Sequence, residues 1–261
     1  MQAVTGSCAA ALDEDLMSVA GYTLAQLMEV AGLGVARVTM DYIKKTAGFR
    51  DSGILIVCGP GNNGGDGLVA ARYLASGPLS IASVCIWLPK ESTGQGPQGM
   101  LRLARQMGII IIEGVGLDSL KAIREFADTC PYLFVLDALF GFNYKGDVIK
   151  EPYNKVTEAI LQISRSETFS SRLKLISIDV PSGWSVDNPD WNPGSSPPSD
   201  KLNPDVVISL TVPKACTMWL EPRVEQYLAG NFLTPVLAEK YDLLDIKDLW
   251  TGIDDIYLQL P

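Results

Sequence analysis

The chain has 261 residues, and 47% of them are hydrophobic, which is enough to bury the core of one full-sized domain. Its formal net charge is −9, with lysines and arginines scattered along the chain, so binding along a nucleic-acid backbone is not expected. Histidine is absent, which excludes Ser-His-Asp and Cys-His nucleophile pairs and histidine-ligated zinc within one chain.

No apolar stretch reaches the roughly 18 residues of a membrane span, so no membrane association is expected. The first fifteen residues are acidic and resemble neither a secretory signal nor a transit peptide. The five cysteines form no C-x-x-C pair, which favours a reducing compartment. We therefore expect a cytoplasmic protein, with mitochondria as the alternative location for a processed precursor.

The first predicted element is a long amphipathic helix over residues 23–46, where Thr23 and Gln26 have the spacing of a capping box. Short apolar runs rich in β-branched residues follow, as expected for parallel strands buried on both faces. They cover residues 54–59, 80–88, 108–112, 132–138, 174–180 and 205–212. Helical patterns lie between them at 66–76, 97–107, 117–128 and 152–164.

This alternation predicts an α/β fold with three layers, a Rossmann-like, mostly parallel sheet with helices on both faces. We expect a single domain over residues 1–261, with its core at about 52–240 and a C-terminal tail at 241–261. Residues 187–204 are rich in Pro, Ser, Asn and Asp and predict a long exposed loop. This loop is either a surface insertion or a lid.

A glycine-rich turn follows the first predicted strand, with Gly59, Gly61 and Gly64 in the order G-x-G-x-x-G. Glycines at a helix start allow phosphate to approach backbone N–H groups. An ordinary dinucleotide site also needs an acidic residue about 20 positions later to bind the ribose. The next strand instead ends in Ile86-Trp87-Leu88-Pro89, so ordinary NAD binding is disfavoured.

Polar residues also follow two other predicted strands, and parallel strands place their carboxyl ends on one edge of the sheet. The converging residues are Asn62, Asn63, Asp66, Asp137, Asp179 and Ser182. Their oxygen atoms suit Na⁺, K⁺, Mg²⁺ or Ca²⁺, and Asp179 or Asp137 could instead transfer protons. Helix capping and turn formation are the simpler roles for each residue taken alone. Without histidine, Ser182 is not expected to act as a nucleophile.

At these residues the chain resembles the YjeF N-terminal domain family, whose enzymes are NAD(P)H-hydrate epimerases. The matching pieces occur in family order from about residue 15 to residue 240. They are residues 26–32 (QLMEVAG), 58–67 (CGPGNNGGDG), 137–142 (DALFGF) with 145–147 (KGD), 179–183 (DVPSG) and 211–214 (TVPK).

The resemblance implies interconversion of the R and S hydrates of NADH and NADPH (NADHX and NADPHX), an isomerase step in nicotinamide nucleotide repair. It implies K⁺ as cofactor, with Asn63, Asp137 and Ser182 as ligands. The substrate-binding positions implied are Asn62, Asn63, Gly64, Gly65, Asp66, Gly141, Phe142, Asn143, Tyr144, Lys145, Gly146, Asp147 and Asp179. It also implies a homodimer and, as pathway partner, a separate ADP- or ATP-dependent NAD(P)H-hydrate dehydratase.

A mechanism can be expected on this basis. Backbone N–H groups of residues 62–67 would bind the pyrophosphate, and Asp179 would be the catalytic acid–base group beside the nicotinamide ring. Lys145 would contact phosphate or stay solvated. Two other functions remain open, a non-catalytic dimeric binding or scaffold module of the same fold and an NAD(P)-dependent oxidoreductase.

Overall fold

The computed structural model describes residues 2–47, 52–76, 83–90, 92, 94–144, 148–252 and 255–261. Within these ranges the strands form one sheet in the order β3-β2-β1-β4-β5-β6-β7-β8. Their bounds are β1 (Ser52–Cys58), β2 (Ser83–Leu88), β3 (Ile110–Glu113), β4 (Tyr132–Ala138), β5 (Leu173–Ile178), β6 (Val206–Leu210), β7 (Glu225–Ala229) and β8 (Tyr257–Gln259). Neighbouring strands are parallel from β3 to β7, and β8 alone is antiparallel to β7.

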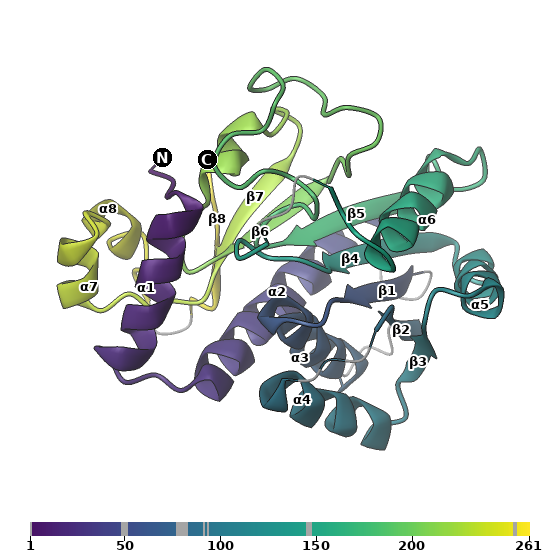
Figure 1. Ribbon diagram of the computed structural model, residues 1–261, viewed down its shortest axis with the longest axis horizontal. Helices are drawn as coiled ribbons and strands as arrows, with labels where there is room; N and C mark the ends of the chain where they lie inside the picture. The colour runs from purple at the N-terminus through teal and green to yellow at the C-terminus, as the bar shows by residue number, and fades with distance from the viewer. Residues whose placement is uncertain are drawn as a thin grey trace.

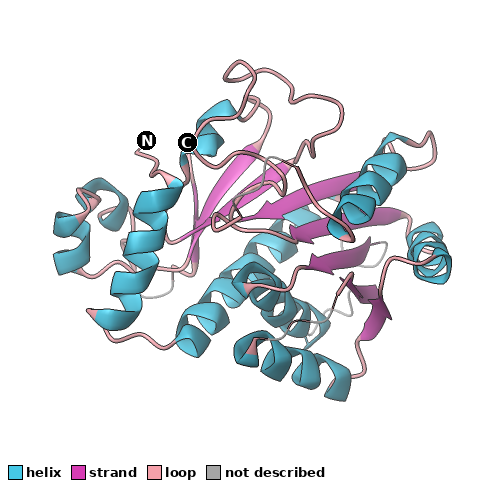
Figure 2. Cartoon of the chain, in the orientation of Figure 1, coloured by secondary structure: helices cyan, strands magenta, loops and turns pink. Residues whose placement is uncertain are grey.

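Helices cover both faces of this sheet (Figure 1, Figure 2). Their bounds are α1 (Gly6–Ser18), α2 (Leu24–Thr46), α3 (Asn62–Ser76), α4 (Gln95–Gln106), α5 (Leu117–Asp128), α6 (Tyr153–Arg165), a 3₁₀ helix η1 (Ala215–Trp219), α7 (Pro235–Lys240) and α8 (Leu244–Lys247). Helices α2, α3 and α4 pack on one face, and α5 and α6 pack on the other. The predicted three-layer α/β/α fold is therefore confirmed.

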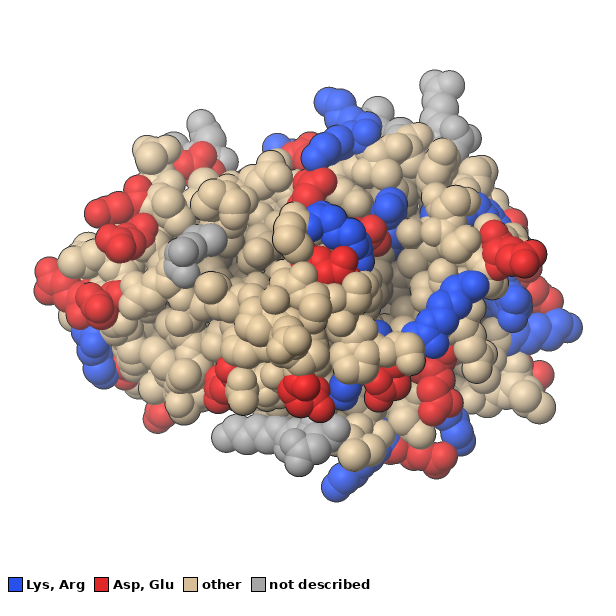
Figure 3. All heavy atoms as spheres, turned by 90° about the horizontal axis from the view of Figure 1, so that it is seen from above, with Lys and Arg blue, Asp and Glu red and all other residues tan. Residues whose placement is uncertain are grey.

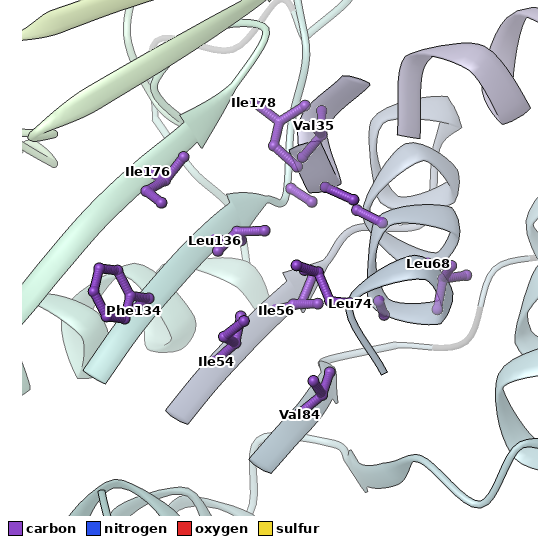
Figure 4. Close-up of a cluster of buried hydrophobic side chains, with 14 of the residues drawn as sticks. Val35, Ile54, Ile56, Leu68, Leu74, Val84, Phe134, Leu136, Ile176 and Ile178 are labelled. Atoms are coloured by element: carbon purple, nitrogen blue, oxygen red, sulfur yellow. The ribbon is translucent and has the colours of Figure 1, made fainter. Parts of the chain in front are cut away.

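The alternation of side chains along each strand creates two separate cores. On one face, Ile54 and Ile56 of β1 pack with Phe134 and Leu136 of β4 and with Val35 of α2 (Figure 4). On the other face, the odd-numbered residues of the same strands contact α5 and α6. Because both faces are covered, the central strands show continuous apolar runs in the sequence.

The long helix predicted over residues 23–46 is α2. Thr23 caps it, and the Gln26 side chain accepts from the Thr23 backbone N–H at 2.8 Å, which completes the capping box. The predicted strands and helices match β1 to β6 and α3 to α6 with shifts of a few residues at their ends. Residues 80–82 of the predicted strand at 80–88 lie outside the described residues.

Six of the described elements were not predicted from the sequence, namely α1, η1, β7, α7, α8 and β8. Helix α1 precedes residue 23, β7 follows the last predicted strand, and β8 lies in the predicted tail. Helices α1, α7 and α8 share an apolar cluster with β7, so the end segments pack together on the sheet's flank.

The connections between strands create a crevice between β1 and β4. The chain runs outward from β1 to β2 and β3, then returns to place β4 on the opposite side of β1. At such a switch point the two loops leaving the strands diverge, and ligands commonly bind there. The polar residues that follow β1 and β4 therefore lie at this crevice.

Acidic and basic side chains are interspersed over the face shown in Figure 3. Of the described helices, none is long and apolar enough to cross a membrane.

Candidate active site

A cavity of about 520 Å³ lies at the carboxyl ends of the central strands. Residues after β1, β4, β5 and β6 all line it, and helices α1 and α2 close it with apolar side chains. The apolar wall consists of Ala9, Leu12, Leu16, Leu24, Leu27, Met28, Ala31 and Phe232. A concave site with a mostly apolar wall and a few polar groups is typical of small-molecule binding.

The glycine-rich turn after β1 holds α3 tightly against the neighbouring loops. A Cβ added at Gly59 would lie 1.7 Å from the Leu139 carbonyl oxygen, and one added at Gly64 would lie 1.9 Å from the Gly59 carbonyl oxygen. At Gly61 an added Cβ would meet nothing within 4 Å. Gly59 and Gly64 are therefore required by packing, whereas Gly61 faces the open cavity.

The amino end of α3 lies at the cavity, where Gly61, Asn62 and Asn63 line it. The first N–H groups of a helix have no acceptor within the helix, and the helix dipole favours a negative charge there. This rim is suited to hold a phosphate-bearing ligand without a lysine or arginine.

Asp137 and Ser182 form a fully buried polar pair behind the cavity. The Ser182 hydroxyl donates to Asp137 Oδ1 at 2.6 Å, and the Ser182 N–H donates to Oδ2 at 2.8 Å. Ser177 Oγ and the Leu139 N–H donate to the same carboxylate at 3.1 and 3.3 Å. Burial raises the pKa of Asp137, and these hydrogen bonds partly offset the rise.

Asn63 contributes a buried oxygen that no group among the described residues satisfies. Its Nδ2 donates to the Ile178 carbonyl oxygen at 3.3 Å, while Oδ1 has no hydrogen-bond partner. A buried amide oxygen without a partner is costly unless a ligand or ion completes it. The Asn63 oxygen, like the oxygens of Asp137 and Ser182, is of the chemical kind that binds hard cations such as K⁺.

Asp179 is held in one orientation at the base of the cavity. Its backbone adopts φ of 70°, a conformation that non-glycine residues seldom adopt, and its N–H donates to the Ile208 carbonyl oxygen at 2.7 Å. Oδ2 accepts from the Phe142 N–H at 2.8 Å. Oδ1 lies 2.5 Å from Lys214 Nζ, a contact of charges without the angle of a hydrogen bond.

Two further carboxyl groups line the same cavity. Burial raises the pKa of Asp66 well above its usual value, and the charges of Asp179 and Asp13 raise it further. Burial also raises the pKa of Asp13, while the charge of Lys214 lowers it and that of Asp179 raises it. The raised pKa of Asp66 favours its carboxylic acid form, which can donate a hydrogen bond into the cavity.

The predicted substrate-binding residues are only partly gathered at the cavity. Asn62, Asn63, Asp66, Gly141, Phe142, Asn143, Tyr144 and Asp179 line it. Gly64 and Gly65 are buried beneath it, where Gly65 packs against Met28. Lys145, Gly146 and Asp147 lie outside the described residues.

Sequence reasoning missed Lys214, Asp13 and the helix that carries Asp13. Lys214 belongs to the quoted 211–214 stretch, yet nothing in the pattern assigns a lysine there to a buried site. Ala9, Leu12 and Leu16 have helical spacing, and this signal could have predicted α1 as a buried helix. What it could not show is that the helix packs over a cavity formed by strand ends far along the chain.

The loop at 187–204 lies on the surface, and two tryptophan side chains anchor it. Trp219 Nε1 donates to the Trp191 carbonyl oxygen at 2.6 Å, and Trp184 Nε1 donates to the Leu202 carbonyl oxygen at 2.9 Å. No described residue of this loop lines the cavity.

Comparison with known proteins agrees with this geometry. The family model described as YjeF-related protein N-terminus matches residues 24–216. An NAD(P)H-hydrate epimerase from Giardia intestinalis is 45% identical over 95% of this chain and 92% of its own length. An NAD(P)H-hydrate epimerase from Aspergillus fumigatus is 37% identical, with 98% and 95% coverage.

A solved structure shows the same fold over the whole chain. The crystal structure of yeast YNL200c superposes with a TM-score of 0.81 at 27% sequence identity and covers 100% of both chains. Because the family model matches residues 24–216 and a relative is 45% identical over 95% of the chain, this chain belongs to the YjeF N-terminal domain family.

Proposed function

We propose that this chain is an isomerase that interconverts the R and S hydrates of NADH and NADPH. The observation that carries the proposal is the cavity between β1 and β4, which has the amino end of α3 at its rim and Asp179 at its base. The names of the curated relatives support it, since those proteins are NAD(P)H-hydrate epimerases.

The two ends of the cavity suit the two ends of such a substrate. The exposed rim at Gly61 and Asn62 offers backbone N–H groups and the helix dipole to the pyrophosphate. The apolar wall formed by Leu12, Leu27 and Phe232 accepts the hydrated nicotinamide ring. A ring bound against this wall lies near the carboxyl groups at the base.

Epimerisation requires that a bond at C6 of the hydrated ring break and form again on the other face. The hydroxyl takes up a proton and leaves C6 as water, while the lone pair of the ring nitrogen forms a double bond to C6. Water then returns to the opposite face and loses a proton. Asp66, whose raised pKa favours the acid form, gives a proton to the departing hydroxyl, and Asp179 accepts a proton from the returning water. The proton then passes from Asp179 back to Asp66 within the cavity, which restores both groups.

We further propose that Asn63, Asp137 and Ser182 hold K⁺, because the unpartnered Asn63 oxygen fits such an ion. A bound cation would neutralise the Asp137 charge and hold the loops after β1, β4 and β5 in fixed positions relative to one another. Asp137 is buried behind the cavity, and both its oxygens already accept hydrogen bonds, so it is not placed to exchange a proton with the substrate. This leaves the acid–base role to Asp179.

The two alternative functions receive less support. A scaffold would not need a cavity with three carboxyl groups and a buried lysine, and the named relatives are enzymes. An NAD(P)-dependent oxidoreductase would need an acidic residue for the ribose at the end of β2, where the chain has Leu88 instead. The predicted homodimer and the separate ADP- or ATP-dependent dehydratase, which would consume the S hydrate, remain part of this proposal.

The test is conversion of purified R hydrate of NADPH into the S form, followed by chromatography. The reaction is run with K⁺ and with Na⁺ in its place, and the uncatalysed rate is subtracted. We expect conversion well above background that is faster with K⁺ and is lost in Asp179→Asn. Conversion no faster than background by a folded wild type would reject the proposal.

A further inference from the structure

Lys214 is a buried lysine to which the proposed reaction assigns no role. Its side chain is only 3% exposed, and the residue lies just after β6 at the start of η1. Burying an ammonium group is costly unless charge and hydrogen bonds compensate it. The groups that contact the Lys214 ammonium must therefore compensate its charge.

The partners of Lys214 all belong to the cavity. Nζ lies 2.5 Å from Asp179 Oδ1 and donates to the Leu210 carbonyl oxygen at 2.7 Å. It also lies 5.2 Å from the centre of the Phe142 ring, within the range of a cation–π contact. The ammonium therefore joins the segments that follow β4, β5 and β6.

The backbone around Lys214 is fixed by the amino-terminal segment. The Val4 N–H donates to the Pro213 carbonyl oxygen at 2.9 Å, and the Ala215 N–H donates to the Val4 carbonyl oxygen at 2.8 Å. These two bonds flank Lys214 directly. Residues before α1 thus hold the lysine in register with Asp179.

The charges facing the cavity are unbalanced without Lys214. Asp13, Asp66 and Asp179 all line the described cavity, and Lys214 is the one cation among its described lining residues. Three carboxyl groups in one apolar-walled cavity would repel each other if more than one were charged. Lys214 supplies the counter-charge directly to Asp179, the carboxylate with a fixed backbone and a fixed Oδ2 contact.

We propose that Lys214 is the positioning residue of this site, which holds the Asp179 carboxylate aimed into the cavity. This inference rests on the proposed function, because it assigns Asp179 to the reacting ring. The ammonium acts through Asp179 and does not itself transfer a proton. It is held on the protein side by Leu210 and Phe142.

The test compares Lys214→Met with the wild type in the same epimerase assay. We expect kcat to fall about 100-fold while KM changes by less than about threefold, since the loss concerns the reacting end rather than binding. Lys201→Met is the matched control, because Lys201 donates to the Gly183 carbonyl oxygen outside the cavity. It should keep wild-type kcat.

Lys214→Met leaves Asp179 without its counter-ion and could fail to fold. The double variant Asp179→Asn with Lys214→Met removes both charges and provides a second measurement. If Lys214 acts through Asp179, the double variant turns over no more slowly than Asp179→Asn alone. A further multiplicative loss in the double variant would overturn the proposal.

Chemical rescue tests whether turnover needs the ammonium at position 214 rather than only the packing of the side chain. Lys214→Cys is treated with bromoethylamine, so that the thiolate displaces bromide and a thioether of lysine's length restores the ammonium. We expect kcat to recover at least about tenfold, whereas capping with neutral iodoacetamide restores nothing. Treated wild type controls for the other five cysteines, four of which are buried.

The outcomes are distinguishable from failure of the proposed function. A wild type without turnover rejects that function and this inference with it. A wild type with turnover and a folded Lys214→Met that keeps kcat within about threefold rejects only the inference. Failure of the aminoethylated protein to recover, with labelling complete by mass spectrometry, also rejects it.

Discussion

Replacing Ser182 by alanine tests the buried polar pair behind the cavity. The change removes the hydroxyl that donates to Asp137 Oδ1 at 2.6 Å and that accepts from the Phe140 N–H at 3.0 Å. The Ser182 N–H still donates to Asp137 Oδ2, so the carboxylate keeps three of its donors. The variant should therefore fold with a measurable loss of stability.

The size of the loss follows from these contacts. A hydrogen bond to a charged acceptor contributes about 2.5 kcal/mol, and leaving the partly buried Phe140 N–H without an acceptor costs about 1 kcal/mol more. The free energy of unfolding should fall by about 3.5 kcal/mol, which corresponds to a melting temperature lower by about 10 °C for a chain of this size.

Ser177→Ala is the matched control. Ser177 Oγ donates to the same carboxylate at 3.1 Å, and its removal leaves no donor without an acceptor. Its cost should be about 1.5 kcal/mol. Urea unfolding followed by circular dichroism measures both variants, and a Ser182→Ala loss no larger than that of Ser177→Ala would refute the reasoning.

Other perturbations address the acid cluster, the glycine turn and α1. Since burial raises the pKa of Asp66 above its unfolded value of 3.8, its contribution to stability is present at low pH and is lost as pH rises from about 4 through the folded pKa. Asp66→Asn should therefore gain melting temperature over wild type as pH is raised from 4 to about 8, and parallel pH curves would contradict this. Gly59→Ala should destabilise the protein by more than about 3 kcal/mol because its Cβ meets the Leu139 carbonyl oxygen, whereas Gly61→Ala should unfold like wild type in urea. Leu12→Ala should cost about 3 kcal/mol and raise KM, because Leu12 is 2% exposed and lines the cavity; unchanged KM would remove α1 from the binding site.

The order of strands and helices was predictable because each central element carries its own local signal. Residues 132–138 were predicted as a strand and form β4 with the same bounds, since the apolar run is bounded by turns and buried on both faces. The short strand β8 has only three residues and no such run, so its pairing with β7 depends on contacts outside its own segment.

The sequence alone determined the fold class and the strand-end residues of the site, because parallel strands place their carboxyl ends on one edge regardless of detailed packing. It placed Asp137, Asp179 and Ser182 there. Only the tertiary structure decided that Lys214 meets Asp179 and that α1 closes the cavity. These contacts join residues far apart in the chain, and no local periodicity encodes which distant surface a buried side chain meets.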